Sequence, residues 1–197
     1  MGRRRKKRST LLIDADILVY RIAISEEEAI CWDEDSELWT LHASLKEAKA
    51  KLQDEVARLC HVLGGVQVIM CFSPRRTFRH KLYPRYKSHR KERKPTIFPA
   101  LRDWAMNEWR SECWPNVEAD DILGVLAKSH TVKGGIKAPK IIVSDDHDML
   151  SVPCLLYQPM HPERGIQRIT YPKARRYHLL QTLMGDSGDG YPGVPGV

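Results

Sequence analysis

Three short apolar runs, separated by helical patterns, restrict this chain to an α/β fold. The runs cover residues 10–13, 66–72 and 140–143, and each is typical of a buried strand. Between the first two, residues 17–24 and 45–63 carry apolar side chains at helical spacing. A strand, a helix and a further strand in this order favour a parallel sheet that is covered by helices.

The remaining patterns predict shorter elements around this sheet. Residues 31–32 and 38–41 flank a polar run and indicate an edge hairpin. Apolar spacing predicts a helix over residues 98–114. We also expect short strands at 155–157 and 166–170, and a helix over 172–184 that begins at a proline.

Composition indicates a single charged globular domain with a polyanionic partner. The chain has 197 residues, a hydrophobic share of 42% and a net charge of +7. Five cysteines without metal or disulfide spacing indicate a reducing, intracellular and cytoplasmic setting, and no apolar run could span a membrane. Residues 1–9 are expected to form a disordered basic arm, with a localisation signal or an added nucleic-acid contact as alternatives.

The densest group of carboxylates stands at residues 118–121, directly before an apolar helical pattern. Helical geometry puts Glu118 and Asp121 on one face and points Asp120 elsewhere. Taken alone, this group would be a common acidic helix start, stabilised by the helix dipole. Aspartate pairs recur, however, at three other places where a strand or helix gives way to a loop: Asp14/Asp16, Asp146/Asp148 and Asp186/Asp189.

These acids together predict a site for divalent metal ions. Carboxylates gathered at strand ends repel one another unless a cation lies among them. Ligands of open α/β sheets bind at the carboxyl ends of strands, where Asp14 is placed. Sets of oxygen ligands suit Mg²⁺ or Mn²⁺.

A strongly basic segment covers residues 75–94. Ten of its twenty residues are Arg or Lys, Glu92 is its one acid, and Phe78, Tyr83 and Tyr86 lie between the cations. Runs of charge usually form no more than a solvated face. Cations interleaved with aromatic rings, however, suit simultaneous contact with phosphates and bases, so we expect this segment to bind nucleic acid.

Together these residues resemble the 5′-3′ exonuclease and flap endonuclease family, especially its phage members. The matching blocks are LLIDAD at 11–16, FRHKLYPRYKSHR at 78–90, VEADD at 117–121, VSDDHD at 143–148 and GDSGDGYPGVPGV at 185–197. The resemblance implies a PIN-like α/β fold, with a mostly parallel central sheet flanked by helices and a basic helical arch at 75–94. It also implies a nuclease domain over 10–184, followed by the start of a helix-three-turn-helix motif that grips duplex DNA.

The resemblance assigns roles to individual residues. Four acids match the family's inner metal ligands, namely Asp14, Glu118, Asp120 and Asp146. Three match the ligands of the second ion, namely Asp148, Asp186 and Asp189, and Asp121 would act through water. Arg79, Lys87 and Arg90 match the basic residues that meet the scissile phosphate beneath the arch. Tyr86 matches an aromatic residue that stacks on the terminal base, and Gly193 and Gly196 match glycines of the DNA-gripping signature.

These matches imply a monomeric enzyme that hydrolyses phosphodiester bonds of DNA with two Mg²⁺ ions, for which Mn²⁺ can substitute. The products would carry 5′-phosphate and 3′-hydroxyl ends. DNA with 5′ ends or flaps would be the substrate, with RNA in RNA–DNA hybrids as a further option, in DNA replication or genome degradation. A K⁺ ion is implied at the helix-three-turn-helix where that motif is complete.

The chain departs from the family pattern in two places. The family has a further aspartate after the second strand, where residues 72–74 of this chain read Phe-Ser-Pro. The inner metal site is therefore expected to lack one carboxylate. The chain also stops at Val197, inside the expected helix-three-turn-helix. A nucleic-acid-binding remnant with impaired catalysis is accordingly the main alternative.

A phosphatase of the haloacid-dehalogenase type is a less favoured alternative. In that case Asp14 would be the nucleophile and Asp16 its acid/base, with Ser144 after a buried strand. The last motif of that family directly follows a buried strand, whereas here it follows the helical pattern of 172–184. The alternative also leaves the acidic group before the helix and the basic segment without a role.

Overall fold

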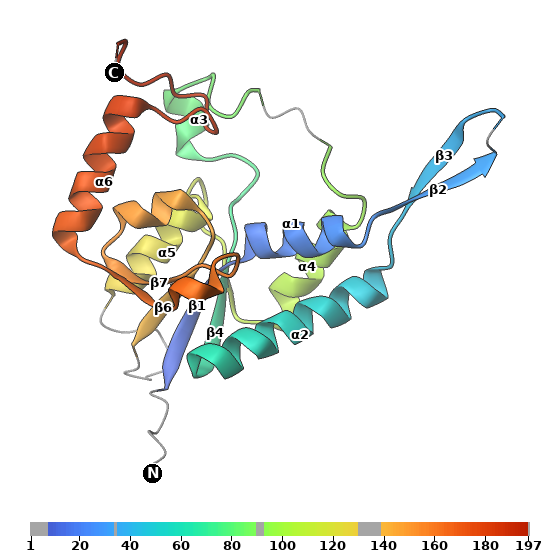
Figure 1. The fold of residues 1–197 in the computed structure, drawn as a ribbon, viewed down its shortest axis with the longest axis horizontal. Coiled ribbons are helices and arrows are strands. Elements are labelled where there is room, and N and C mark those ends of the chain that lie inside the picture. Colours follow the sequence, from blue (N-terminus) through green and yellow to red (C-terminus); the bar gives the residue numbers. More distant parts are fainter. Residues whose placement is uncertain (1–7, 34, 90–92, 130–138, 197) are drawn as a thin grey trace.

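A six-stranded sheet forms the centre of the molecule (Figure 1). The structure is a computed structural model that describes residues 8–33, 35–89, 93–129 and 139–196. The three predicted buried strands are β1 (Ser9–Asp14), β4 (Gly65–Cys71) and β6 (Lys140–Val143). They lie side by side, because β1 pairs in parallel with both β4 and β6. The carboxyl ends of these strands therefore share one edge of the sheet.

Shorter strands extend the sheet in both directions. On one side β7 (Cys154–Tyr157) pairs in parallel with β6, and β8 (Gln167–Ile169) pairs antiparallel with β7. On the other side β5 (Ser111–Glu112) pairs in parallel with β4. The order is β5-β4-β1-β6-β7-β8. The predicted mostly parallel sheet is thus confirmed, together with both of its later strands.

Helices cover both faces of the sheet. Alternate residues of β1 point to opposite sides and so belong to two different cores. Leu11 and Ile13 belong to one core cluster, with residues of α1 (Ala15–Ser25), α2 (Leu45–Leu63) and α4 (Phe98–Glu108). Leu12 belongs to the other, with residues of α5 (Ala119–Lys128), α6 (Tyr171–Met184) and the 3-10 helix η1 (His147–Ser151). Ser44 caps α2, and Gly64 ends it with a positive φ of 69°.

The predicted helix over 98–114 is wrong beyond Glu108. Buried Leu101 and Ala105 give α4 its apolar face, but the backbone of Trp109 is extended. The chain then runs along β4, where the carbonyl oxygens of Arg110 and Glu112 accept hydrogen bonds from the N–H groups of Met70 in β4 and of Phe72 just after it. Helical spacing in the sequence could not anticipate this, because the donors lie on a strand that is distant in the sequence.

The predicted edge hairpin exists but does not join the central sheet. Strands β2 (Glu28–Asp33) and β3 (Leu38–His42) form a separate two-stranded ribbon. Figure 1 shows this ribbon projecting away from the sheet and its helices. The predicted basic arm is one residue too long, because Ser9 is buried and belongs to β1; residues 1–7 lie outside the described parts of the chain.

The basic segment begins with one short helix, α3 (Phe78–Leu82). Turns follow up to residue 89, and residues 90–92 lie outside the description. Within the described part, the expected helical arch is therefore helical only in α3. None of the described helices has the length and apolarity needed to cross a membrane.

Candidate active site

The site is built at the ends of β1 and β6, where a buried serine joins two predicted metal ligands. Asp14 ends β1, and its Oδ1 accepts a hydrogen bond from the backbone N–H of Ile17 at 3.3 Å. The Ser144 hydroxyl donates to Asp14 Oδ2 at 2.8 Å and accepts from the backbone N–H of Asp146 at 3.0 Å. Ser144 therefore orients both acids. This role was not predicted from the sequence, although the position of Ser144 directly after a buried strand was visible there.

Five predicted metal ligands form two overlapping groups. Carboxylate oxygens of Asp120, Asp146 and Asp148 lie within 4.8 Å of one another, and so do those of Asp148, Asp186 and Asp189. Asp148 belongs to both groups. Two neighbouring sets of oxygen ligands that share one carboxylate suit a pair of hard divalent cations.

Burial and mutual repulsion make this cluster unfavourable as free carboxylates. Burial raises the pKa of Asp14 to about 7, and the charges of Asp16 and Asp146 add to the effect against the Ser144 hydrogen bond. Burial and the charges of Asp14, Asp146 and Asp148 raise the pKa of Asp120 well above its ordinary value. Burial also raises the pKa of Asp148. A cation among these groups would relieve both effects, so the donor set fits divalent metal ions.

A tight glycine-bearing turn brings Asp186 and Asp189 into the second group. Asp186 and Tyr191 exchange backbone hydrogen bonds of 2.8 and 2.7 Å, which closes the turn after α6. Gly185 and Gly193 both have positive φ, and their backbones approach closely. A Cβ at Gly193 would lie 2.5 Å from the Gly185 nitrogen. The predicted signature glycine Gly193 therefore closes this turn. Gly196 also has a positive φ, but a Cβ added there would meet nothing within 4 Å.

The side chain of Gln181 links Asp148 of η1 to Asp186 of this turn. Its amide donates to Asp148 Oδ1, and it also lies 3.4 Å from Asp186 Oδ2. Gln181 was missed from the sequence. One signal was present there, namely a polar residue on α6 about one turn before Asp186.

Glu118 and Asp121 share one face of α5, as the sequence predicts, and that face meets the basic segment. Arg79 donates to both carboxylate oxygens of Asp121 at 2.6 and 2.9 Å, and lies 3.3 Å from Glu118 Oε2. Lys87 Nζ lies 3.3 Å from Glu118 Oε1 and 3.5 Å from Asp189 Oδ1. Asp120 faces the other acids instead. Arg79 and Lys87 thus contact the edges of the carboxylate cluster.

The backbone of Lys87 is fixed against the same turn. Lys87 has a positive φ of 53°, and its N–H donates to the carbonyl oxygen of Asp189 at 3.1 Å. Tyr83 donates to the carbonyl oxygen of Gly190 at 3.2 Å and its ring contacts that of Tyr191. The first part of the basic segment is therefore docked on the acidic site. Arg90, predicted to act beside Lys87, lies outside the described residues.

Tyr86 does not have the open ring that stacking on a base requires. Its side chain is 7% exposed, and its hydroxyl donates to Glu118 Oε2 at 2.7 Å. The ring packs edge-on against His80, and Lys87 Nζ lies 4.7 Å from its centre. In this structure Tyr86 orients Glu118. The predicted stacking role would require the ring to move out of this position.

The end of β4, where the expected family aspartate is absent, has a neighbouring acid. The N–H of Ser73 donates to Asp16 Oδ2 at 2.7 Å, and the Ser73 hydroxyl accepts from the N–H of Ala119 at 3.0 Å. Arg102 contacts Asp16 Oδ1 at 3.4 Å and donates to the carbonyl oxygen of Ser73 at 2.8 Å. Ser73 thus ties α1 to the start of α5, and Arg102, missed from the sequence, offsets the charge of Asp16.

The phosphatase alternative fails on the placement of its last motif. Gly185 and Asp186 follow α6, a helix of 14 residues, and not a strand of the sheet. The acids of α5, which that alternative does not use, include Asp120, which lies in the same cluster as Asp146.

Comparison with known proteins identifies the family of the chain. Residues 9–154 match the model of the 5′-3′ exonuclease N-terminal resolvase-like domain. The chain is 30% identical to the exodeoxyribonuclease of Enterobacteria phage T3 and to the exonuclease of Escherichia phage T7, over 94% of its own length. It spans 62% and 63% of those two relatives.

Solved structures share the fold. The chain is similar to the bacteriophage T5 5′-exonuclease with bound zinc, with a TM-score of 0.68 and 17% identity. It is equally similar to the T5 flap endonuclease in a pseudo-enzyme-product complex with DNA and metal ions, with a TM-score of 0.68 and 15% identity. Both likenesses cover 97% of this chain and 71% of the other. By sequence and by fold, the chain belongs to the 5′-3′ exonuclease family.

Proposed function

We propose that this chain is a metal-dependent 5′-3′ exonuclease and flap endonuclease that hydrolyses phosphodiester bonds of DNA by a two-metal mechanism. The observation that carries the proposal is the pair of carboxylate groups that share Asp148. Membership of the exonuclease family supports the same reaction, and the T5 relative was solved with DNA and metal ions.

Each carboxylate group would hold one ion. Asp120 and Asp146, with Asp14 beside them, would bind the first, and Asp186 and Asp189 the second, with Asp148 between the two. When bound, Mg²⁺, or Mn²⁺ in its place, would supply Lewis-acid activation of water and offset the charge on the attacking and leaving oxygens. A K⁺ ion would bind near residues 185–197 only in a protein whose helix-three-turn-helix is complete.

Arg79 and Lys87 would bind the scissile phosphate. Arg79 is held by two hydrogen bonds to Asp121, so its guanidinium is fixed beside the cluster. Lys87 lies between Glu118 and Asp189, next to the second carboxylate group. Fixed positive charge at this place stabilises the additional negative charge of the transition state. Glu118 would act here by positioning Lys87 as well as by any direct contact with an ion.

The basic segment would bring DNA with 5′ ends or flaps to this cluster. Two of its cations, Arg79 and Lys87, already contact the edge of the site. RNA–DNA hybrids are a further proposed substrate, and we expect a monomer that works inside the cell, in replication or genome degradation.

A DNA-binding protein with impaired catalysis is the second candidate, because the end of β4 carries Ser73 in place of an acid. Asp16 lies against that position but is paired with Arg102. If the missing carboxylate is essential, the protein would bind DNA through the basic segment and cleave it slowly.

One assay separates these candidates. The chain is incubated with a 5′-labelled flap DNA, a 5′-labelled blunt duplex and a matched RNA–DNA hybrid, in Mg²⁺, in Mn²⁺ or in a chelator. The proposal expects metal-dependent shortening or flap release from the 5′ end, with products that carry 3′-hydroxyl groups. Tight DNA binding without cleavage in either metal would favour the impaired protein and overturn the proposed activity.

A further inference from the structure

The β2–β3 ribbon leaves large apolar side chains in solvent. Trp32 is 66% exposed, Trp39 59%, Leu38 54% and Leu41 46%. Figure 1 shows the ribbon extending away from the sheet and the helices that cover it. Two strands alone are only marginally stable in water, and adjacent exposed apolar side chains are typical of an interaction surface.

Apolar residues occupy both faces of this ribbon. The strand register places Ala29 opposite Leu41 and Cys31 opposite Trp39 on one face. Ile30 lies opposite Thr40 on the other face, where Trp32 Nε1 donates to Thr40 Oγ1 at 2.6 Å. A hairpin packed on its own protein would bury one face and keep the other polar. This ribbon does neither within the described residues.

The charge of the ribbon is opposite to that of the molecule. Residues 26–42 contain seven acids and neither lysine nor arginine, in a chain whose net charge is +7. Asp33 accepts hydrogen bonds from the Asp35 N–H at 3.0 Å and the Ser36 hydroxyl at 2.6 Å, so acids are grouped at the tip. Such a surface repels the phosphates of DNA and of anionic lipid, and attracts a basic protein surface.

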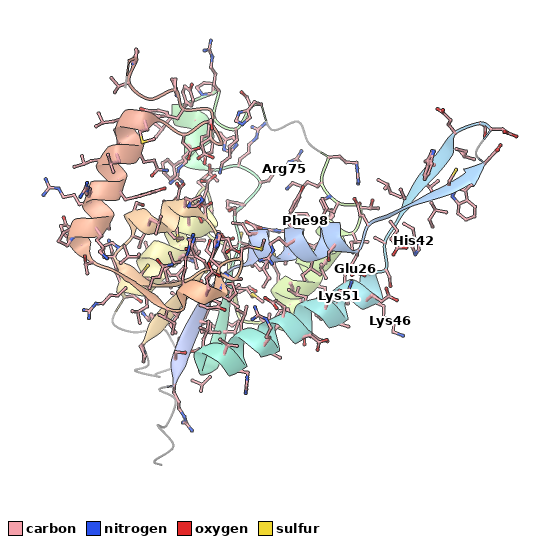
Figure 2. All side chains as sticks on the ribbon, in the orientation of Figure 1. Glu26, His42, Lys46, Lys51, Arg75 and Phe98 are labelled. Atoms are coloured by element: carbon pink, nitrogen blue, oxygen red, sulfur yellow. The ribbon has the colours of Figure 1, made fainter. Side chains whose placement is uncertain are left out.

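The base of the ribbon is anchored to α2 and to the basic segment. Glu26 pairs with Lys51 of α2 at the base (Figure 2). Glu27 pairs with Arg93 at 2.6 Å and accepts from the Thr96 hydroxyl at 2.7 Å, which fastens the ribbon to the far end of the basic segment. A protein held on the ribbon would therefore lie beside the segment that is proposed to bind DNA.

We propose that the β2–β3 ribbon is a docking arm for another protein, one that offers an apolar groove bordered by lysine or arginine. Trp32 and Trp39 lie on opposite faces of the ribbon, so the groove would close over both faces and take one tryptophan on each side. Asp33, Asp35 and Glu37 would pair with the cations at its border. Large aromatic anchors surrounded by polar contacts are the usual source of affinity at such interfaces. This surface goes beyond the proposed nuclease activity and does not depend on it.

The test uses a fluorescent twelve-residue peptide of alternating lysine and leucine as the probe, and an alternating glutamate–leucine peptide as its charge control. Fluorescence anisotropy measures binding to the full chain in Mg²⁺ and physiological salt. Two variants change the ribbon, namely Trp32→Ser with Trp39→Ser, and Asp33→Asn with Asp35→Asn and Glu37→Gln. Leu179→Ser with Leu180→Ser is the matched control, because these α6 leucines are exposed to a similar degree but lie beside Arg175 and Arg176.

We expect the lysine peptide alone to bind, and each ribbon variant to weaken it by about tenfold or more. The α6 variant should bind like the wild type, and all variants should cleave or bind flap DNA like the wild type. Unchanged peptide binding in the ribbon variants would overturn the proposal. So would loss of DNA binding in them, which would make the ribbon a DNA contact. Sedimentation that shows a wild-type dimer, dissociated by the tryptophan changes, would overturn it in favour of self-association.

Discussion

The buried aspartates of this site hold their protons more tightly than aspartates in water do. Burial and neighbouring charges raise the pKa values of Asp14 and Asp120 and so favour their protonated forms, and the pKa of Asp148 moves in the same direction. Only a bound cation allows several of these groups to be ionised together at low cost. The metal-free protein is therefore expected to hold protons at the carboxylates where metal ions would bind.

The raised pKa of Asp14 predicts how the stability of the metal-free protein depends on pH. An unfolded aspartate has a pKa of about 3.9, whereas that of folded Asp14 is raised to about 7. Between these values the folded state binds a proton that the unfolded state does not, so stability falls as the pH rises through this window. We expect the Tm of the chelated protein to fall from about pH 5 to about pH 7, and added Mg²⁺ to restore it near pH 7.

Thermal unfolding followed by circular dichroism measures this effect, with Asp14→Asn as the control. The variant lacks the group that titrates, so its Tm should fall less over the same range. A chelated wild-type protein whose Tm rises steadily from pH 5 to pH 7 would contradict the assignment of raised pKa values to the cluster.

Ser73 offers a test of the missing carboxylate. An aspartate at this position could still accept the hydrogen bond from the Ala119 N–H and would add a charge near Asp16 and the cluster. We expect Ser73→Asp to lower the Mg²⁺ concentration needed for half-maximal cleavage by about tenfold, and wild-type protein to be more active in Mn²⁺ than in Mg²⁺. Ser73→Asn, with a similar shape but no charge, should leave the Mg²⁺ titration unshifted. An unshifted titration for Ser73→Asp would mean that another group already serves the site.

Among the elements, those set by local pattern were predictable and those set by distant partners were not. The buried strands β1, β4 and β6 were recognisable because continuous apolar runs between helical patterns require a parallel sheet. Strand β5 was not, because it forms only where β4 offers unpaired backbone groups. The ribbon was recognisable as a hairpin, but its separation from the sheet depends on where α1 and α2 direct its ends.

In the site too, some residues were predictable from local pattern and others depend on distant partners. Positions at the ends of strands and helices identified Asp14, Asp120 and Asp146 as neighbours, because parallel strands end at one edge of the sheet. Ser144, Gln181 and Arg102 each make a hydrogen bond to a residue distant in the sequence, and their position in the sequence does not show which residue that is. The burial of Tyr86 likewise depends on how the basic segment docks on α5.

The turn after α6 positions Asp186 and Asp189, and Gly193 tests how closely it must be packed. A methyl group at Gly193 would meet the backbone of Gly185 and Met184 at 2.5 Å, so Gly193→Ala should open the turn and displace Asp186 and Asp189. We expect cleavage to fall by at least about tenfold, through loss of the second metal position. Gly196→Ala is the control, since it carries the strain of a positive φ, about 1 kcal/mol, without a close approach to other atoms.

Cleavage rates and Mg²⁺ titrations of Gly193→Ala and Gly196→Ala measure whether the close approach at Gly193 positions the acids. Equal, small losses in both would show that the close approach at Gly193 does not position the acids.

Across the whole molecule, charge is divided among three regions. Acids fill the site at the carboxyl edge of the sheet, cations dominate residues 75–94, and acids return on the β2–β3 ribbon. DNA is therefore expected to approach along the basic segment and away from the ribbon. We expect the basic residues before residue 9 to add long-range attraction; unlike the segment that carries Lys87, they have no aromatic rings among them.

This division predicts different kinetic effects for the two basic regions. Deletion of residues 2–8 should weaken DNA binding in a salt-dependent manner, by close to one unit of log-log slope for each phosphate that these residues neutralise, and leave single-turnover cleavage at saturating DNA unchanged. Lys87→Ala should slow that cleavage step by about 100-fold, because its charge acts most strongly in the transition state. Lys81→Ala, an exposed lysine of α3, is the matched control. A larger slowing from the deletion than from Lys87→Ala would place the active cleft elsewhere.

The central claim is that the two carboxylate groups sharing Asp148 form the metal centre of a nuclease. Single-turnover cleavage of a 5′-labelled flap DNA at saturating Mg²⁺, measured together with DNA affinity for Asp146→Asn, tests it most directly. Asp145→Asn is the control, because Asp145 pairs with Arg21 at 3.1 Å and belongs to neither carboxylate group. We predict that Asp146→Asn lowers the rate by at least about 100-fold with equal or tighter DNA binding, and that Asp145→Asn cleaves like the wild type. Near-normal turnover of Asp146→Asn would contradict the account.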